Sequence, residues 1–204
     1  MLLLVELKIL FIIMYNIKNC NACTLSLFRN KIINSIGNIE SDIMIILDTP
    51  AKIEDEEGEA LISKGNKFLL DKLECLNLID ISYITYLIKC KPPGTRQADN
   101  NEIYTCKTKH LYEELMFVKP KMIILLGSNP IKAFFDLKQS IHQLAGSKGR
   151  FKGCIYCLNY SPVMAIKNED IKIEFISNML NFGEVYKHNI NITHSFNSIK
   201  QLYD

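Results

Sequence analysis

The stretch KPKMIILLGSNP, residues 119–130, decides how the rest of the chain is interpreted. Its centre is a continuous apolar run between turn residues, which is typical of a strand buried on both faces. Pro120 marks the turn into this strand, and residues 127–129 follow as a strand end and a helix N-cap, with Pro130 at the first helical position. The stretch therefore predicts a buried strand that passes directly into a helix.

Three further segments rich in Ile and Leu have the same character, and helical patterns separate them. The predicted strands span residues 42–47, 83–89, 121–127 and 154–159. The predicted helices span residues 64–76, 101–118, 129–137 and 169–180. Alternating strands and helices indicate an α/β protein, here a three-layer α/β/α fold with a four-stranded parallel sheet. The carboxyl ends of such strands border the binding crevice, so the segments after them should surround any site: residues 48–62, 90–98, 127–130 and 159–166.

The composition fits a single globular domain. The chain has 204 residues, 48% hydrophobic and 23% charged, which excludes a disordered or collagen-like protein. We expect an N-terminal extension at residues 1–14, the domain at 15–181 and a loosely packed tail at 182–204; a packed strand is the alternative for residues 1–13. The net charge of +2 is too small to indicate a nucleic-acid partner, so only local basic clusters can do so.

The apolar N-terminal stretch, residues 1–15, differs from a signal peptide because it lacks a preceding basic segment and a small-residue cleavage site. It is also too short to cross a bilayer, which takes about 20 apolar residues. We therefore expect a cytoplasmic protein without a membrane partner, and we expect it to be a monomer.

Seven cysteines are an odd number, which favours intracellular thiols or metal ligands over a disulfide framework. Cys20 and Cys23 form a CxxC pair before the first strand, Cys90 ends the second strand, and Cys106 lies in the following helix. Four thiolates from these segments could converge on one point, as a four-iron or zinc site requires.

The other three cysteines have simpler explanations. Cys154 and Cys157 lie three positions apart in a predicted strand, so they should point to opposite faces of the sheet and cannot easily share a metal. Cys75 fits the apolar face of a helix, where we expect it to be a buried hydrophobic residue.

Several motifs occur in order along the chain: Cys20-x-x-Cys23 with Leu25 and Arg29, Pro50, Glu54-Asp55-x-x-Gly58, Tyr83-Ile84-Thr85, KCKPPGTR at 89–96, Glu102-x-x-x-Cys106, residues 119–127, and Tyr160-Ser161-Pro162. With these motifs the chain resembles the iron–sulfur uracil-DNA glycosylases, family 4 of the uracil-DNA glycosylase superfamily, from about Tyr15 to Leu180. The resemblance implies that Cys20, Cys23, Cys90 and Cys106 hold a [4Fe-4S] cluster with a structural rather than a redox role. It also implies hydrolysis of the N-glycosidic bond of a damaged base in DNA.

The base pocket departs from this family at several positions. The resemblance places Leu61 where the family stacks uracil on an aromatic ring, Tyr86 where an asparagine reads the uracil edge, and Ser161 where a histidine stabilises the charged base oxygen. Asp48 replaces a glutamate, and of that first motif only Pro50 is kept. Because the reaction needs charge stabilisation and a held base, we expect weak or absent activity on uracil.

Two explanations stay open: a pocket recast for another base, or a DNA-binding or DNA-polymerase-associated relative without catalysis. In the first, Asp48 with Thr49 could position a water, Tyr86 could stack a base, and Asn159 could donate an amide hydrogen bond. In the second, Tyr86 is a core residue and Asp48 part of a strand-end turn. The candidate catalytic residues are therefore Asp48, Thr49 and Ser161, and the candidate pocket residues are Pro50, Leu61, Tyr86 and Asn159.

Two basic segments indicate DNA as the partner. Lys91 and Arg96 flank the Pro-Pro-Gly loop, and Lys148, Arg150 and Lys152 alternate along residues 146–153. We expect both segments at the mouth of the crevice, where phosphate contacts would make binding strongly salt-dependent. The alternative is that they are solvated loop charges. The acidic run at residues 54–59 is expected to face solvent, except for its first two residues.

Overall fold

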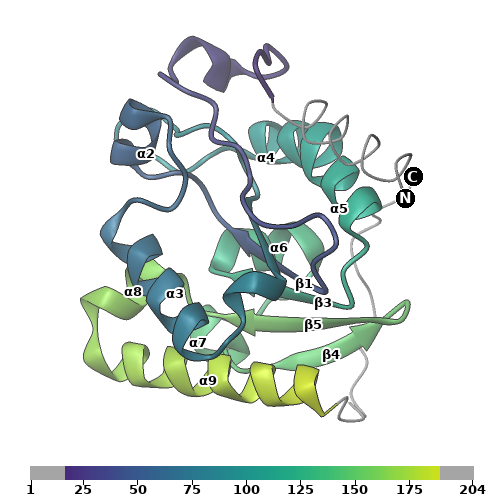
Figure 1. Cartoon of the computed structure of the whole chain (residues 1–204). Coiled ribbons are helices and arrows are strands. Elements are labelled where there is room, and N and C mark those ends of the chain that lie inside the picture. Colours follow the sequence, from purple (N-terminus) through teal and green to yellow (C-terminus); the bar gives the residue numbers. More distant parts are fainter. Residues whose placement is uncertain (1–16, 189–204) are drawn as a thin grey trace.

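The computed structural model describes residues 17–188, so the expected extension at 1–14 lies outside the described residues. A five-stranded sheet in the order β2-β1-β3-β5-β4 forms the centre of the molecule (Figure 1). Its strands are β1 Ile43–Leu47, β2 Ser82–Tyr86, β3 Met122–Leu126, β4 Lys148–Phe151 and β5 Cys154–Asn159. The four predicted strands are confirmed and run parallel, whereas β4 pairs antiparallel with β5 and was not predicted.

Helices cover both faces of the sheet, which confirms the predicted three-layer fold (Figure 1). Alternate strand residues belong to separate cores: Met44 and Ile123 pack with the helices α4 to α6, and Ile45 and Ile124 pack with α3, α8 and α9. The helices are α2 Lys52–Glu57, α3 Lys64–Cys75, α4 Asn100–Cys106, α5 Tyr112–Val118, α6 Ser128–Phe134, α7 Ile141–Leu144, α8 Pro162–Lys167 and α9 Glu169–Lys187. Shorter turns are the 3₁₀-helices η1 Thr24–Leu27 and η2 Ile79–Ile81 and the π-helix η3 Lys107–Leu111.

Several boundaries differ from the sequence prediction; strand β2, for example, ends at Tyr86 rather than at residue 89, so Cys90 lies beyond the strand. The expected single helix at 101–118 contains the π-helical turn η3. Helix α6 begins at Ser128 and is capped by Gly127, so residue 129 is not its N-cap. Helix α9 continues to Lys187 and buries Phe182 and Val185, so the domain extends past the expected boundary at residue 181.

The cysteine predictions outside the proposed cluster have mixed outcomes. Cys154 and Cys157 pack in opposite cores, as predicted. The prediction for Cys75 was wrong, because this last residue of α3 is exposed. Within residues 17–188, no helix has the length and apolar character needed to cross a membrane.

Candidate functional site

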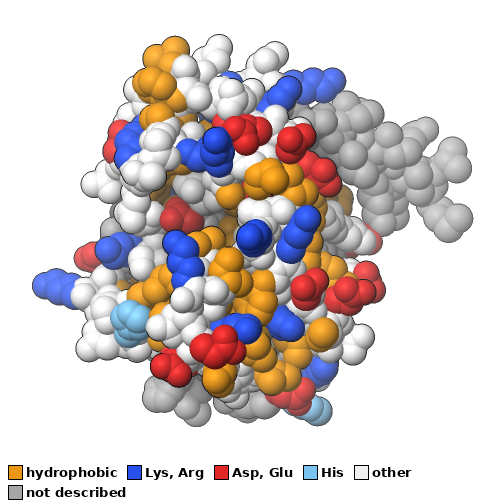
Figure 2. All heavy atoms as spheres, turned by 90° about the vertical axis from the view of Figure 1, so that its left-hand side faces the viewer, with side chains coloured by type: hydrophobic (Ala, Val, Ile, Leu, Met, Phe, Trp, Pro, Cys, Tyr) orange, Lys and Arg blue, Asp and Glu red, His pale blue; other side chains and the backbone are white. Residues whose placement is uncertain are grey.

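The parallel strands end together at one edge of the sheet. The register aligns Leu47 of β1 with Tyr86 of β2, and Leu126 of β3 with Asn159 of β5. Helices α2, α6 and α8 begin just beyond these strand ends, and α2 and α8 lie on the left of Figure 1. Figure 2 faces this side and shows basic side chains interspersed with acidic and hydrophobic ones rather than gathered into one patch. The candidate catalytic residues follow these strands, so the fold brings them to the same edge.

Asp48 lies at this edge in an incompletely paired environment. Its Oδ2 accepts a hydrogen bond of 2.8 Å from Nδ2 of Asn129, whereas Oδ1 is buried without a hydrogen-bond partner among the described residues. Burial raises the pKa of Asp48 above its ordinary value, and the bond from Asn129 opposes this shift. Asn129 falls within residues 127–130, which the sequence placed around any site, but its contact with Asp48 was not predicted.

Ser161 lies close to this corner because α6 and α8 begin side by side. Gly127 has a φ of +106°, and a Cβ added there would lie 3.3 Å from the Cβ of Ser161. The Ser161 hydroxyl accepts a 3.3 Å bond from the backbone N–H of Met164 and so caps α8. Thr49 is half-buried and Pro50 buried directly after Asp48. The hydroxyl of Ser161 therefore has a structural use that the family's histidine position did not suggest.

Tyr86 is a buried core residue. Its side chain is 1% exposed, and its hydroxyl accepts hydrogen bonds from the backbone N–H of Leu61 (3.2 Å) and from Nδ2 of Asn66 (3.1 Å). Burial and the nearby Glu54 carboxylate raise its pKa, so the phenol stays protonated. Leu61 is also buried and takes a φ of +62°. In this conformation the ring of Tyr86 is packed in the core rather than open to a base.

Glu54 fixes the loop beside Tyr86. It is fully buried, and its carboxylate accepts bonds from the N–H of Ala51 (2.6 Å), Nδ2 of Asn66 (2.6 Å) and the N–H of Ser63 (3.3 Å). Asp55 is buried as well, and residues 56–59 are exposed. The acidic run therefore faces solvent except for its first two members, as predicted.

Asn159 is not available to a base. It is fully buried; its Nδ2 donates to the carbonyl of Phe175 (3.1 Å), and its Oδ1 accepts from Nδ2 of Asn178 (3.1 Å), both on α9. The Oδ1 also accepts the N–H of Tyr160 (3.0 Å). Strand alternation turns this amide toward the α9 layer, so its prediction as a pocket residue was wrong.

The basic side chains of the Pro-Pro-Gly loop form hydrogen bonds that hold the loop in place. Arg96 forms two bonds with Glu102, of 2.7 and 2.8 Å, which hold the pKa of that carboxyl down to about 2. Nζ of Lys91 donates to the carbonyls of Pro92 (2.7 Å) and Gly94 (2.9 Å). The loop follows β2 and lies at the predicted edge. Its two cationic side chains, however, already form hydrogen bonds within the protein.

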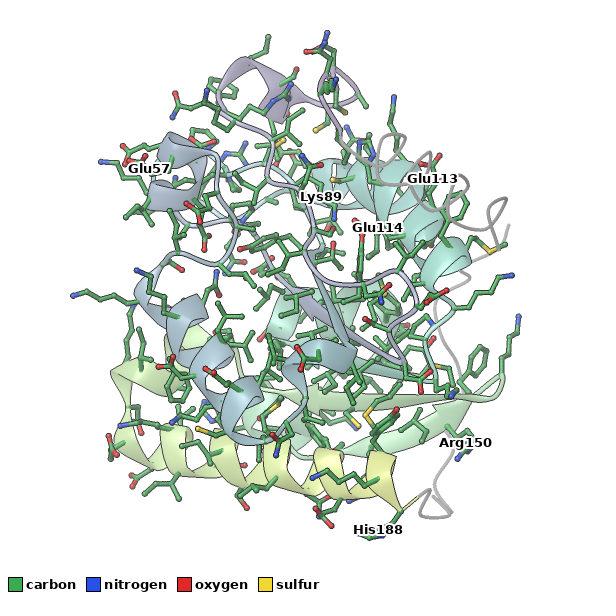
Figure 3. The ribbon with its side chains drawn as sticks, in the orientation of Figure 1. Glu57, Lys89, Glu113, Glu114, Arg150 and His188 are labelled. Carbon is green, nitrogen blue, oxygen red and sulfur yellow. The ribbon has the colours of Figure 1, made fainter. Side chains whose placement is uncertain are left out.

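The second basic segment lies elsewhere. Residues 148–151 form β4, and the tight turn to β5 puts Arg150 and Lys152 at the amino ends of the parallel strands. Figure 3 shows Arg150 at the lower right, whereas α2 and α8 lie at the left, near the opposite ends of the strands. Lys148 bonds Oδ1 of Asn181 on α9. The expected position of Arg150 and Lys152 at the crevice mouth was therefore wrong, because an edge strand without an apolar run gives no periodic signal.

The four predicted cluster cysteines line a single cavity. They come from the segment before η1, the stretch after β2 and the end of α4: Cys20, Cys23, Cys90 and Cys106. Oγ1 of Thr24 donates a 2.8 Å bond to Oε1 of Glu102 and so ties η1 to α4. All seven cysteines are free, and within residues 17–188 no group of three or more His, Cys, Asp or Glu side chains is close enough to hold a single metal ion.

A nitrogen lies within hydrogen-bond reach of each of the four sulfurs. Cys20 Sγ lies 3.3 Å from Nε2 of His110, Cys90 Sγ 3.8 Å from Nη1 of Arg29, and Cys106 Sγ 3.4 Å from the backbone nitrogen of Lys89. The backbone of Leu25 bonds Cys23. Burial raises the pKa of Cys90 to about 12 and that of Cys106 to about 11. Donors around four converging sulfurs suit metal-bound thiolates, so the residues present fit an iron–sulfur cluster.

Comparisons with known proteins identify relatives of this chain. A search against sequence families matches residues 35–186 to the Uracil DNA glycosylase superfamily. The chain is 28% identical over 176 residues to a type-4 uracil-DNA glycosylase of Pyrobaculum aerophilum, covering 81% of this chain and 89% of that protein. It is 24% identical over 185 residues to a type-4 uracil-DNA glycosylase of Archaeoglobus fulgidus, covering 85% and 91%. The chain belongs to the uracil-DNA glycosylase superfamily, and its similarity to the type-4 enzymes confirms the resemblance seen in its motifs.

Proposed function

We propose that this protein is a DNA repair hydrolase that cleaves the N-glycosidic bond of a damaged base and has weak or no activity on uracil. Membership of the superfamily supports a uracil-DNA glycosylase-like repair function. The observation that carries the proposal is the contrast at the carboxyl edge of the sheet. The Asp48 carboxylate keeps one oxygen without a partner among the described residues, whereas Tyr86 occupies the position that reads uracil in the resembled family.

The chemistry assigned to Asp48 follows from its environment. Cleavage of the bond places positive charge on the sugar and needs a positioned water. With Asn129 holding Oδ2, the other oxygen of Asp48 can accept a hydrogen bond from such a water. The charged form also stabilises a nearby cation, and burial strengthens that interaction. Thr49 and Ser161, at the same edge, complete the proposed catalytic set.

The case against uracil rests on Tyr86, Leu61 and Asn66. The Tyr86 hydroxyl takes up the N–H of Leu61 and the amide of Asn66, so these donors are already used within the protein. Leu61 cannot offer an aromatic ring to a base. Loss of one preorganised donor typically costs about 10²–10³ in rate, and here several contacts change together.

We further propose that Cys20, Cys23, Cys90 and Cys106 hold a [4Fe-4S] cluster, which would join three chain segments. DNA is the proposed partner, and the loop carrying Lys91 and Arg96 is the candidate for phosphate contact in a monomeric, cytoplasmic protein. Arg96 is braced by Glu102, so we expect it to shape this loop as well as to face phosphate.

The test is base release from a panel of oligonucleotides. The iron-loaded protein is incubated with strands containing uracil, hypoxanthine, xanthine or a mismatch, and abasic sites are detected by strand cleavage. We expect release of a base other than uracil, and a loss of about 10²–10⁴-fold in Asp48→Asn. Brisk release of uracil, or unchanged activity in the variant, would contradict the proposal.

The burial of Tyr86 favours a second candidate function, a DNA-binding or DNA-polymerase-associated module without catalysis. It predicts that no lesion is released while DNA binding stays salt-sensitive. Asp48→Asn would then leave DNA affinity unchanged. The same panel, read together with a binding titration at two salt concentrations, separates the two candidates.

A further inference from the structure

His110 is a further residue at the cysteine cavity, outside all the motifs that carry the family resemblance. Its ring lines the cavity together with the four cysteines, and the side chain is 8% exposed. Its Nε2 lies 3.3 Å from Sγ of Cys20. A histidine so placed either fills space or acts on the sulfur.

The helix that carries Cys106 also positions His110. The two residues are four apart, and residues at this spacing lie on one face of a helix. His110 lies in the π-helix η3, Lys107–Leu111, which follows Cys106 directly, and π-helical turns are frequent at functional sites. Leu111 is fully buried, and Nζ of Lys107 donates to the carbonyl of Ala133 (3.0 Å), so the turn is fixed on both sides of His110.

Cys20 is the sulfur that most needs such support. Cys90 and Cys106 are buried, whereas Cys20 and Cys23 are half-buried; Cys23 is the N-cap of η1, but Cys20 lies in a segment without regular secondary structure. Arg29 secures the backbone here, because its Nη2 donates to the carbonyl of Cys20 at 2.7 Å. The sulfur itself is met by His110.

We propose that His110 is a positioning residue for the cluster, donating Nε2–H to the thiolate of Cys20 and so holding this ligand in place. The inference rests on the proposed [4Fe-4S] site. Partners outside the ligand shell orient ligands and typically change metal affinity about 10–100-fold when they are mutated. Hydrogen bonds to the sulfurs also help to set the reduction potential, because they stabilise the additional negative charge of the reduced cluster.

The experiment compares His110→Leu, which removes the donor, with His110→Gln, which keeps an N–H in a similar position. His188→Leu is the matched control, since His188 lies on the surface of the chain at the end of α9 and pairs with Glu184. Iron content, decay of the visible absorbance under a chelator, and midpoint potential are measured on the full chain. Far-UV circular dichroism verifies folding.

We expect His110→Leu to lose iron about 10–100-fold faster and to have a lower midpoint potential. His110→Gln should stay close to the unsubstituted protein, and His188→Leu should match it. Unchanged iron loss and potential in His110→Leu would overturn the role of His110, as would equal losses in the Leu and Gln variants. An unsubstituted protein that takes up no iron would instead overturn the cofactor proposal, and with it this inference.

Discussion

The cysteine cavity and the base pocket lie in one domain but differ in how closely they follow the resembled family. In the cavity, all four implied ligands are present, and a nitrogen lies within hydrogen-bond reach of each sulfur. In the pocket, the resemblance implies different residues at four positions, and the Tyr86 hydroxyl is hydrogen-bonded within the protein. The cavity joins distant chain segments, so it supports the fold, whereas Leu61 and Tyr86 of the pocket are packed in the core.

We expect the largest effect from removing one of the cysteines that line the cavity. Cys90→Ala removes a buried cysteine of the proposed cluster site, and we expect loss of the iron, of the visible colour and of much of the thermal stability, since metal binding and folding are coupled. Absorbance, iron content and a thermal melt measure this. Cys75→Ala is the matched control, because Cys75 is exposed and should leave all three unchanged. A colourless protein with one bound zinc would contradict the cluster.

A buried ion pair lies beside the cysteine cavity. Lys89 and Glu114 are each 1% exposed, with Nζ and Oε1 2.6 Å apart, and Figure 3 shows them facing one another. Lys89 also bonds Ser35 and Thr85, and its backbone N–H reaches Cys106. We expect Glu114→Gln to cost about 3–5 kcal/mol in the free energy of unfolding, because a buried charge loses its partner.

Urea unfolding measures this cost, and Lys121→Met is the control, since it breaks the exposed pair with Asp42. That control should change stability by less than about 1 kcal/mol. If the two variants lose equal stability, the buried pair contributes no more than an exposed one. If Glu114→Gln keeps its stability but loses iron, the pair serves the cavity alone.

Tyr86→Phe tests whether the Tyr86 hydroxyl holds the pocket closed. We expect a smaller loss of stability than in Glu114→Gln. Removal of the hydroxyl leaves the N–H of Leu61 and the amide of Asn66 without this acceptor, which should cost about 1–3 kcal/mol. Urea unfolding is the measurement, and Tyr104→Phe is a control because that tyrosine is exposed. A variant as stable as the unsubstituted protein would show that the hydroxyl does not hold the pocket closed.

The predictability of these regions differs for physical reasons. Buried parallel strands are continuous apolar runs, so the central sheet could be predicted from the sequence, and the alternation of Cys154 and Cys157 followed from strand geometry. The edge strand β4 has no such run, and the π-helix η3 leaves no periodic mark. The family resemblance singled out the four cysteines that line the cavity. The partners of Asn159 and Tyr86 could not be predicted, because hydrogen bonds between α9 or the Leu61 loop and the sheet depend on tertiary packing.

Asp48→Asn should have the smallest effect on stability, and one of opposite sign. Because burial raises the pKa of Asp48 in the folded protein, the unfolded chain releases this proton at a lower pH than the folded one. Stability therefore falls as the pH rises from the ordinary aspartate pKa through the raised value, and is regained on acidification. An asparagine removes the buried charge but can still accept the bond from Asn129.

We expect a modest gain in thermal stability at neutral pH that disappears at acidic pH, together with loss of base release. Melting curves across this pH range measure the first effect. A variant that is less stable at every pH would mean that the charge is well paired, and Asp48 would then be a structural residue like Glu54 rather than a carboxylate kept for chemistry.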